Sequence, residues 1–285
     1  FGTNWMSRIS IFNPHLNYTL TVSMTYLPTG GSPGIEKLID IPANSTFWSD
    51  NVLWDVFRVS QRGGSLLLAT FPDDNPGVPD NVISRSFLVT SDTFNNVPSG
   101  TYGQTIPGTF TGLMDIDTDG ISSISHGITN STQFRWRTNV GAVNIGRCEV
   151  TLRVSVYDDE GRTVLNAAPF GVPPLGHIQH LLPVQVNSGT VEFWVEDPCA
   201  THPVDYAVVF PYTSTIDELS GDPRYQSPTL LASAGSLYNA KTAKIDPHSI
   251  GKKIDVSYAR GIREQAERRG KAQLVRTPTG WQVID

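Results

Sequence analysis

Charged residues and cysteines are scarce in this sequence. Only 17% of its 285 residues are Asp, Glu, Lys or Arg, whereas glycine and proline occur 25 and 20 times. This composition favours a turn-rich, all-β chain over a helical or a disordered one. No run of about 18 apolar residues occurs, so no segment is predicted to span a membrane. The chain begins at Phe1 without a basic and then apolar leader, so a signal peptide is either absent or already removed.

The sequence also lacks the common catalytic motifs. It has no G-x-S-x-G, no H-E-x-x-H, no Gly-rich phosphate loop before a helix and no C-x-x-C. His177 and His180 form the closest pair of histidines, and a spacing of three on a strand places them on opposite faces. They could share a metal ion only in a loop or a helix. We therefore expect a protein that is not an enzyme.

The two cysteines, Cys148 and Cys199, are too few for a disulfide scaffold, and their spacing matches no metal-binding motif. A single bridge between them is predicted if the protein is exported, because an oxidising compartment favours the pair. The alternative is two buried thiols that act as small apolar residues.

A segment near the N-terminus recurs in the second half of the chain. Four landmarks reappear 131 residues later: Trp5 as Trp136, Asn13 as Asn144, Tyr26 as Tyr157, and Ile41-Pro42 as Val172-Pro173. Within the second strand of the segment the match improves at 130 residues, which predicts that the preceding turn has lost one residue in the second copy. Two related domains are therefore expected.

The recurring segment has the pattern of a half-buried strand. Leu20, Val22, Met24 and Tyr26 alternate with Ser and Thr residues, and this period of two predicts one buried and one solvated face. The Asn13-Pro14 pair cannot continue a strand ladder, so a turn is expected there. Residues 44–57 are predicted to contain a short helical turn, and residues 189–195 are aligned with residues 63–69.

The predicted fold class is all-β, with two tandem antiparallel β-sandwich domains of the Ig-like or jelly-roll-like kind and a small basic C-terminal αββ tail. The predicted domains are a first sandwich at 1–108, a linker with an acidic loop at 109–132, a second sandwich at 133–230 and the tail at 231–285. Residues 98–107 are assigned to a connection.

The tail differs from the rest of the chain in charge. Residues 241–285 carry ten Lys or Arg and five Asp or Glu, and since the whole chain carries −6, residues 1–240 carry −11. Ile254, Tyr258 and Ile262 form an apolar stripe at helical spacing, and Trp281 and Val283 lie in a predicted hairpin. About 45 residues cannot build a core alone, so these five residues are predicted to dock on another surface.

One acidic loop resembles a cation site. Asp115, Asp117 and Asp119 alternate and are followed by Gly120, as in the first half of a Ca²⁺-binding loop. The twelfth position is His126, where such loops carry a bidentate Glu, and no helical pattern flanks the segment. The alternatives are a Ca²⁺ site and a solvated acidic linker.

Aromatic residues suggest a sugar-binding alternative. Trp48, Trp54 and Trp136 are predicted at strand ends or in loops, where aromatic rings can stack on pyranose rings. The repeat equivalence of Trp5 and Trp136 argues instead that these two pack between strands.

Several turn and strand motifs occur together in the chain, among them FRWRTNVGAVN, YDDEGR, VPPLGH and DYAVVF in the second half and IFNP, YLPTG, IPANST, SRSF and GTYGQTIPG in the first. With these motifs, residues 4–228 resemble an uncharacterised family of tandem β-sandwich domains in secreted bacterial proteins. The resemblance implies an extracellular or cell-surface location and brings no catalytic residues.

The sequence therefore predicts a non-enzymatic, extracellular structural, adhesive or assembly protein, with the tail docking on a neighbouring subunit or another protein. A homo-oligomer or polymer is expected. The alternative is a carbohydrate-binding module, and nucleic-acid binding by the basic tail is a third and less favoured reading.

Overall fold

The computed structural model describes residues 5–31, 34–60, 62–79, 85–97, 100–108, 122–146, 148–196, 209–231, 272–277 and 280–284. The chain divides into two compact units. Unit 1 comprises Phe1–Pro28, Pro33–Gly108 and Asp255–Asp285, and unit 2 comprises Thr29–Ser32 and Thr109–Ile254. Each unit is described by itself below.

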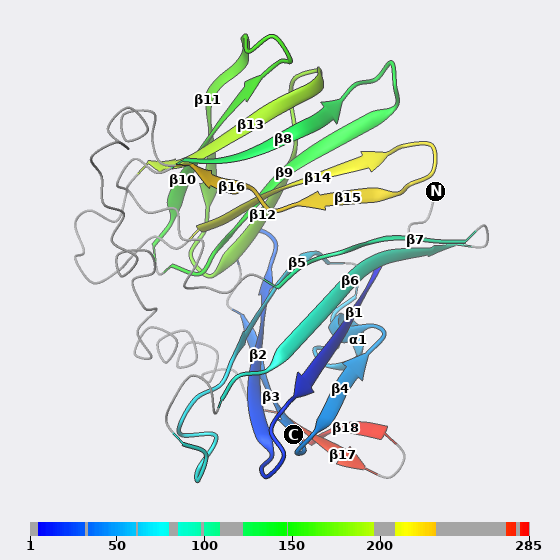
Figure 1. Cartoon of the computed structure of the whole chain (residues 1–285), viewed down its shortest axis with the longest axis vertical. Coiled ribbons are helices and arrows are strands. Elements are labelled where there is room, and N and C mark those ends of the chain that lie inside the picture. The colour runs from blue at the N-terminus through cyan, green and yellow to red at the C-terminus, as the bar shows by residue number, and fades with distance from the viewer. Residues whose placement is uncertain are drawn as a thin grey trace. The chain divides into compact units, whose positions relative to one another are not determined.

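The fold is all-β, with four sheets and one four-residue helix among the described residues (Figure 1). In chain order the elements are β1 (Trp5–Asn13), β2 (Leu20–Pro28), β3 (Ile35–Ile41), β4 (Ser45–Ser49), α1 (Val52–Asp55), β5 (Gly64–Ala69), β6 (Leu88–Val97), β7 (Gly100–Thr105), β8 (Ser122–Asn130), β9 (Trp136–Asn144), β10 (Val150–Tyr157), β11 (Thr163–Val172), β12 (Gly176–Leu181), β13 (Val186–Glu196), β14 (Val209–Asp217), β15 (Pro223–Gln226), β16 (Thr229–Leu231), β17 (Ala272–Thr277) and β18 (Gly280–Ile284). The helical turn predicted within residues 44–57 is confirmed as α1.

The first sheet of each unit has the same strand order. It runs β4-β1-β6-β7 in unit 1 and β12-β9-β14-β15 in unit 2, with every neighbour antiparallel. The registers also agree. In unit 1, Ile11 pairs with Val89 and Asn13 pairs with Ser45. The equivalent pairs of unit 2 are Ala142 with Pro211 and Asn144 with Gly176. The repeat inferred from the sequence thus extends to the pairing of individual residues.

The second sheets share a three-strand block and differ beside it. The order is β18-β17-β3-β2-β5 in unit 1 and β11-β10-β13-β8-β16 in unit 2, so that β3-β2-β5 corresponds to β11-β10-β13. Unit 1 gains β17 next to β3, in a parallel pairing, whereas unit 2 gains β8 next to β13.

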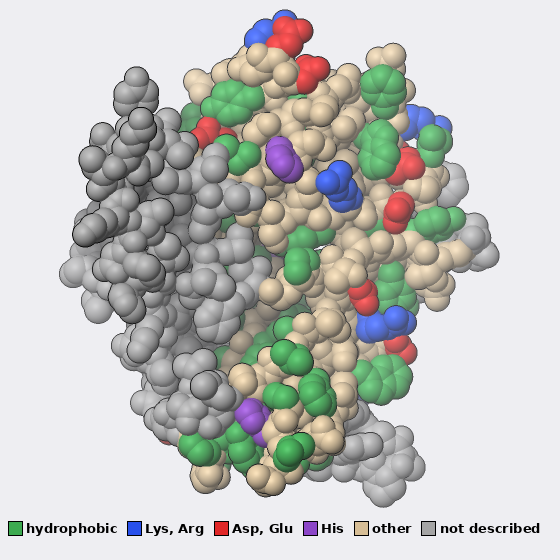
Figure 2. Space-filling model, in the orientation of Figure 1, with side chains coloured by type: hydrophobic (Ala, Val, Ile, Leu, Met, Phe, Trp, Pro, Cys, Tyr) green, Lys and Arg blue, Asp and Glu red, His purple; other side chains and the backbone are tan. Residues whose placement is uncertain are grey.

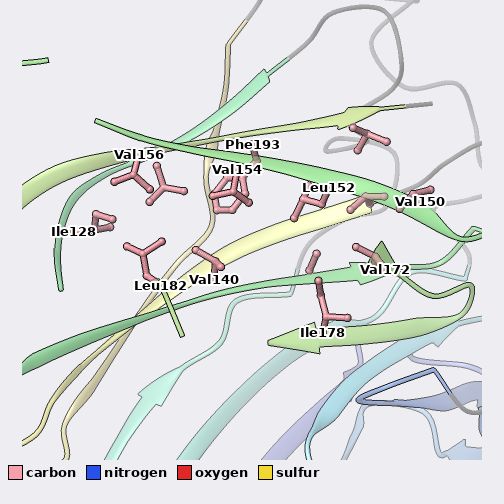
Figure 3. Packing of buried hydrophobic residues seen from close by; sticks show 14 of the residues in the cluster. Ile128, Val140, Val150, Leu152, Val154, Val156, Val172, Ile178, Leu182 and Phe193 are labelled. Carbon is pink, nitrogen blue, oxygen red and sulfur yellow. The ribbon is translucent and has the colours of Figure 1, made fainter. Parts of the chain in front are cut away.

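Each core is built from side chains of both sheets of its unit. In unit 1, Leu20, Val22 and Met24 of β2 are fully buried together with Ile9 and Ile11 of β1, which confirms the predicted inward phase of β2. The predicted solvated face of this strand is wrong, because Ser23 and Thr25 are buried as well. In unit 2, side chains from β10 and β13 meet side chains from β9 and β12, as Figure 3 shows for Leu152, Phe193, Val140 and Ile178. Each unit is therefore sandwich-like.

A buried asparagine organises the same turn in both units. Asn13 donates from Nδ2 to the carbonyl of Ile41 at 2.9 Å and accepts from the backbone N–H of His15. Asn144 donates to the carbonyl of Val172 at 3.1 Å and accepts from the N–H of Gly146.

The asparagines also locate the lost residue. Nδ2 of Asn13 reaches the carbonyl of Tyr18, five residues on, and that of Asn144 reaches the carbonyl of Cys148, four residues on. The donors His15 and Gly146 both lie two residues after their asparagine, whereas the acceptors Tyr18 and Cys148 lie five and four residues after it, so the deletion falls between Gly146 and Cys148. The predicted loss of one residue in this turn is thus explained.

Three sequence assignments need correction. Residues 122–130, assigned to the linker, form β8, which pairs with β13. Residues 100–105, assigned to a connection, form β7. The alignment of residues 189–195 with 63–69 is shifted by one, because Gly189 corresponds to Gly64 in the shared ladder.

The reasons are physical. Ser123 and Ser125 of β8 are buried, so the polar residues that suggested a linker point inward. A side chain at Gly64 or Gly189 would collide with the carbonyl of Leu27 or of Tyr157 respectively, and this close approach fixes the two glycines as equivalent.

Candidate functional site

The outer face of the first sheet of unit 1 carries an exposed tryptophan, Trp48. Ile9 and Ile11 of β1 point into the core, so Arg8, Ser10 and Phe12 point to the opposite side. Side chains of β4 and β6 that pair with these three residues share that side. We call this surface the outer face of unit 1.

Three apolar side chains from adjacent strands lie at one end of this face. Phe12 pairs directly with Leu88 of β6, and Trp48 of β4 pairs with the neighbouring Ser10. Directly opposed residues have Cβ atoms about 5 Å apart, and diagonal neighbours lie about 7–8 Å apart. Trp48 is 58% exposed and Leu88 is 65% exposed. We call Phe12, Trp48 and Leu88 the tryptophan patch.

Charged groups lie at the other end of the face. Arg8 donates from Nε to Oδ1 of Asp50 at 2.8 Å, and its guanidinium carbon lies 5.2 Å from the centre of the Phe94 ring. Asp92 is the register partner of Arg8 and accepts a hydrogen bond from Thr105. Both partners of the ion pair are about half exposed, so it adds little stability and remains available to a ligand.

A second exposed tryptophan follows β4 in the chain. Trp54 lies in α1 on the side away from Val52 and Val56, which are buried in the core. The guanidinium of Arg58 lies 5.9 Å from the Trp54 ring. Figure 2 shows hydrophobic side chains beside acidic and basic ones over the region of β4 and α1.

The equivalent face of unit 2 carries different chemistry. Gln179 occupies the position of Trp48, and His177 the position of Thr46. Gly141 replaces Ser10 and makes room for the ring of Tyr212, since a Cβ at residue 141 would lie 2.2 Å from that ring. The Tyr212 hydroxyl lies 2.7 Å from Nε2 of His177, and the Tyr212 ring stacks on Tyr225 of β15.

The His177–Tyr212 pair is held in its neutral form. Burial lowers the pKa of His177 to about 4, and burial also raises the pKa of the Tyr212 hydroxyl well above its ordinary value. Nδ1 of His177 lies 2.7 Å from the hydroxyl of Thr29, another residue of unit 2. At neutral pH the pair therefore supplies neither an ionised base nor a phenolate, and its hydrogen bonds serve structure.

The predicted site residues fall in different parts of the chain. His177 and His180 lie on the strand β12, and His177 is buried whereas His180 is exposed and contacts the ring of Phe170. Cys148 is disulfide-bonded, and Cys199 lies outside the described residues, so the predicted pairing stays a prediction. The proposed cation ligands also lie outside the described residues: Asp115, Asp117 and Asp119.

The predicted docking residues of the tail are described only in part. Trp281 and Val283 lie in β18, where the backbone alone is described. Three others lie outside the described residues: Ile254, Tyr258 and Ile262. Where side chains are described, no group of three His, Cys, Asp or Glu residues is arranged as metal ligands.

The aromatic prediction identified part of the outer face. Trp48 and Trp54 are exposed as a binding platform requires, whereas Trp136 is partly buried at the first position of β9. Trp5 is 40% exposed at the start of β1, so the expectation that it packs between strands is wrong. Phe12 and Leu88 were not singled out, although the inward phase of Ile9 and Ile11 would have placed Phe12 on the outer face.

Comparison with known proteins assigns this chain to no family. No protein-family model matches the chain, and no curated protein sequence matches it significantly. Within the described residues, the structure contains no helix with the length and apolar character of a membrane span.

Proposed function

We propose that this protein is a non-enzymatic, extracellular structural or adhesive protein built from two tandem β-sandwiches, and that the outer face of unit 1 binds a second copy of the chain. The exposed tryptophan patch carries the proposal. The extracellular location is supported by the resemblance of residues 4–228 to sandwich domains of secreted bacterial proteins.

The composition of the face suits a protein partner. Aromatic residues and arginine are enriched at the centres of protein interfaces, and truncation of such residues costs the most binding energy. Trp48 and Phe12 supply the aromatic area, and Arg8 lies on the same face beside Asp50. Covering Trp48 and Leu88 would remove two large apolar side chains from water, at about 25 cal/mol for each Å² buried.

Carbohydrate binding is the second candidate function. Trp48 is flanked on its face by hydroxyl side chains, since Ser10 is its register partner and Thr90 pairs with Ser10 from the other side. A pyranose could stack on the indole ring and form hydrogen bonds with these hydroxyls. Leu88 favours the protein partner, because an aliphatic side chain offers a sugar neither a stacking face nor a hydrogen bond.

The test compares two equally exposed apolar residues. Trp48 and Leu181 are both 58% exposed, on β4 and β12. We expect Trp48→Ala to weaken binding of the intact chain to an immobilised copy by at least tenfold, with Leu181→Ala unchanged, as measured by biolayer interferometry. Equal binding by the two variants would refute the role of the patch.

A glycan array separates the two candidates. For a sugar-binding face, labelled protein should bind specific glycans, Trp48→Ala should lose that binding and Leu88→Ser should keep it. For a protein-binding face, Leu88→Ser should weaken self-association as well.

The C-terminal tail is proposed as a further docking element. Its charge of +5 beside a −11 body favours contact with an acidic surface, and we propose a neighbouring copy as its partner. β17 of the tail pairs with β3 of the same chain, so deletion from Gly235 onward should lower the melting temperature of unit 1 as well as reduce assembly. Normal assembly of the truncated chain would exclude the tail as the connector between copies.

A further inference from the structure

The outer edge of β5 has no strand beside it among the described residues. β5 is the last strand of its sheet and pairs only with β2. Its counterpart in unit 2 is β13. In unit 1, Leu66 and Leu68 of β5 pair with Tyr26 and Met24 of β2. In unit 2, Val191 and Phe193 of β13 pair in the same register with Val156 and Val154 of β10. The other edge of β13 is filled by β8, which runs antiparallel to it. In unit 2, the equivalent edge of this shared three-strand block is therefore paired with an antiparallel strand.

β5 also lacks the features that usually protect a sheet edge. Natural edge strands carry charges, prolines or bulges that prevent pairing with another chain. β11, an edge strand of unit 2, contains Pro169 and has irregular pairing with β10, and the edge strand β15 begins with Pro223 and Arg224. β5 has the sequence Gly-Ser-Leu-Leu-Leu-Ala and pairs with β2 without a register shift.

The outward-facing position of β5 is apolar. Leu66 and Leu68 pack against the core of unit 1, so Leu67 points to the other face of the sheet. The equivalent residue of β13 is Glu192, whose carboxylate accepts a hydrogen bond from the hydroxyl of Tyr157 at 2.8 Å. Unit 1 thus has leucine where unit 2 has a charge.

We propose that the β5 edges of two copies of this chain pair antiparallel about a two-fold axis centred on Leu67. Leu67 then lies opposite Leu67 of the partner subunit, and Leu66 lies opposite Leu68 of the partner subunit. The two second sheets join into one continuous sheet. This contact is separate from the tryptophan patch, which lies on the first sheet of unit 1.

A second copy is the occupant that the sequence of β5 favours. An antiparallel two-fold pairing places identical segments opposite each other, and three leucines centred on Leu67 match themselves in that register. β5 carries no charge that would repel its own copy. Arg62 precedes β5 and Asp73 follows it, so each basic flank runs beside the acidic flank of the partner subunit.

Cysteine cross-linking tests the register. Opposed residues of an antiparallel pair have Cα atoms about 4.5–5.5 Å apart, within the range that a disulfide spans. Oxidised Leu67→Cys should therefore form a covalent dimer on a non-reducing gel. Ser65→Cys alone should not, because in this register the two cysteines are offset by four residues, about 13 Å along the strand. A mixture of Ser65→Cys and Ala69→Cys chains should form the mixed dimer.

A charge substitution tests the edge in solution. Leu67→Lys places two lysines opposite each other, and in a Trp48→Ala background, which removes the proposed contact of the tryptophan patch, we expect it to shift the mass measured by light scattering from dimer towards monomer. Leu181→Lys is the control, since it adds the same charge to an exposed leucine of another edge strand. Both variants should keep the circular dichroism spectrum of the parent chain.

Three results would overturn the proposal. They are a monomeric parent chain at the concentrations used for cross-linking, equal cross-linking of Leu67→Cys and Ser65→Cys, and an unchanged dimer in Leu67→Lys. If the parent is monomeric but binds a synthetic peptide of residues 122–130, the edge takes a separate strand and the two-copy pairing is refuted. Trp48→Ala should leave the Leu67→Cys cross-link intact, so failure of the tryptophan patch is distinguishable from failure of this proposal.

Discussion

Removing the buried asparagine of either turn should destabilise the unit that contains it. In Asn13→Ala, the carbonyl of Ile41 loses a buried hydrogen bond, and partly buried bonds to the carbonyls of Tyr18 and Pro42 and to the N–H of His15 are lost as well. A buried polar group left without a partner costs about 1–3 kcal/mol, and water can partly replace the others. We expect a loss of about 2–4 kcal/mol in the opening free energy of β1–β3.

Asn144→Ala should cost at least as much in unit 2. Two of its three bonds, to Val172 and from Gly146, are buried, and all three are between 2.7 and 3.1 Å long. Asn17→Ala is the control, because Asn17 is an exposed asparagine in the same turn as Asn13 and should change stability by no more than about 0.5 kcal/mol.

Hydrogen exchange measured by mass spectrometry can assign each loss to a unit. Asn13→Ala should speed exchange in peptides from β1, β2 and β3, and Asn144→Ala in peptides from β9, β10 and β11. A loss below about 1 kcal/mol in either variant would contradict the reasoning, since it would mean that the buried carbonyls find other partners. Faster exchange spread equally over both units would contradict the independence of the two turns.

Three further predictions concern the cores. Val22→Asp buries a carboxyl among apolar side chains of β2 and should lower the free energy of unfolding of unit 1 by more than about 3 kcal/mol, as measured in urea, whereas Val22→Ile should not. Ser123→Ala and Ser125→Ala should each raise the stability of unit 2 by roughly 0.5–1 kcal/mol, because their buried hydroxyls have no hydrogen-bond partner within the described part of the chain; a loss of stability would reveal a partner. Burial lowers the pKa of His177 from its ordinary 6.5 to about 4. On acidification the imidazole is therefore protonated in the unfolded chain before it is protonated in the folded chain. The free energy of unfolding should fall as the pH drops from about 6.5 towards 4. At pH 4.5 the loss should reach about 2–3 kcal/mol relative to His177→Gln, and equal pH profiles of the two proteins in urea unfolding would show that His177 is not buried in solution.

The strands with regular alternation were predictable because their pattern is local. Val22 and Met24 show the buried phase of β2 without reference to any other segment, and the recurrence of Trp5 and Asn13 predicts a second copy. β8 could not be found in this way. Its serines face the core and His126 faces solvent, so the contrast between apolar and polar residues that indicates a strand is absent. Pairing with β13 determines its conformation.

The candidate site was predictable only in part. Trp48 and Trp54 stood out by residue type alone. Their neighbours Phe12 and Leu88 are brought to the same face by the register of β1 with β4 and β6, which is a tertiary property that no local pattern specifies. The acidic loop and most of the tail lie outside the described residues.

The duplication allows equivalent positions of the two units to be compared, which distinguishes residues required by the shared fold, here called the frame, from residues that differ in their surface chemistry. Positions that keep their role in both units belong to the frame, such as Asn13 and Asn144, or Asn44 and Leu175, which both adopt a positive φ near 50°. A leucine is costly in that conformation, so the conformation is required by the turn and not by the residue. The outer face follows the opposite rule, because equivalent positions carry Trp48 in one unit and Gln179 in the other.

The β5 edge also differs between the units, with Leu67 in one and Glu192 in the other. At these two positions unit 1 has an apolar side chain where unit 2 has a polar one, whereas the order is reversed at Asp50 and its counterpart Leu181. Random divergence of a solvated surface would be expected to favour polar residues in both units, because exposed apolar patches promote association. Both proposed contacts lie on unit 1, and two such surfaces on separate sheets would let each copy contact two others and so extend an assembly beyond a dimer.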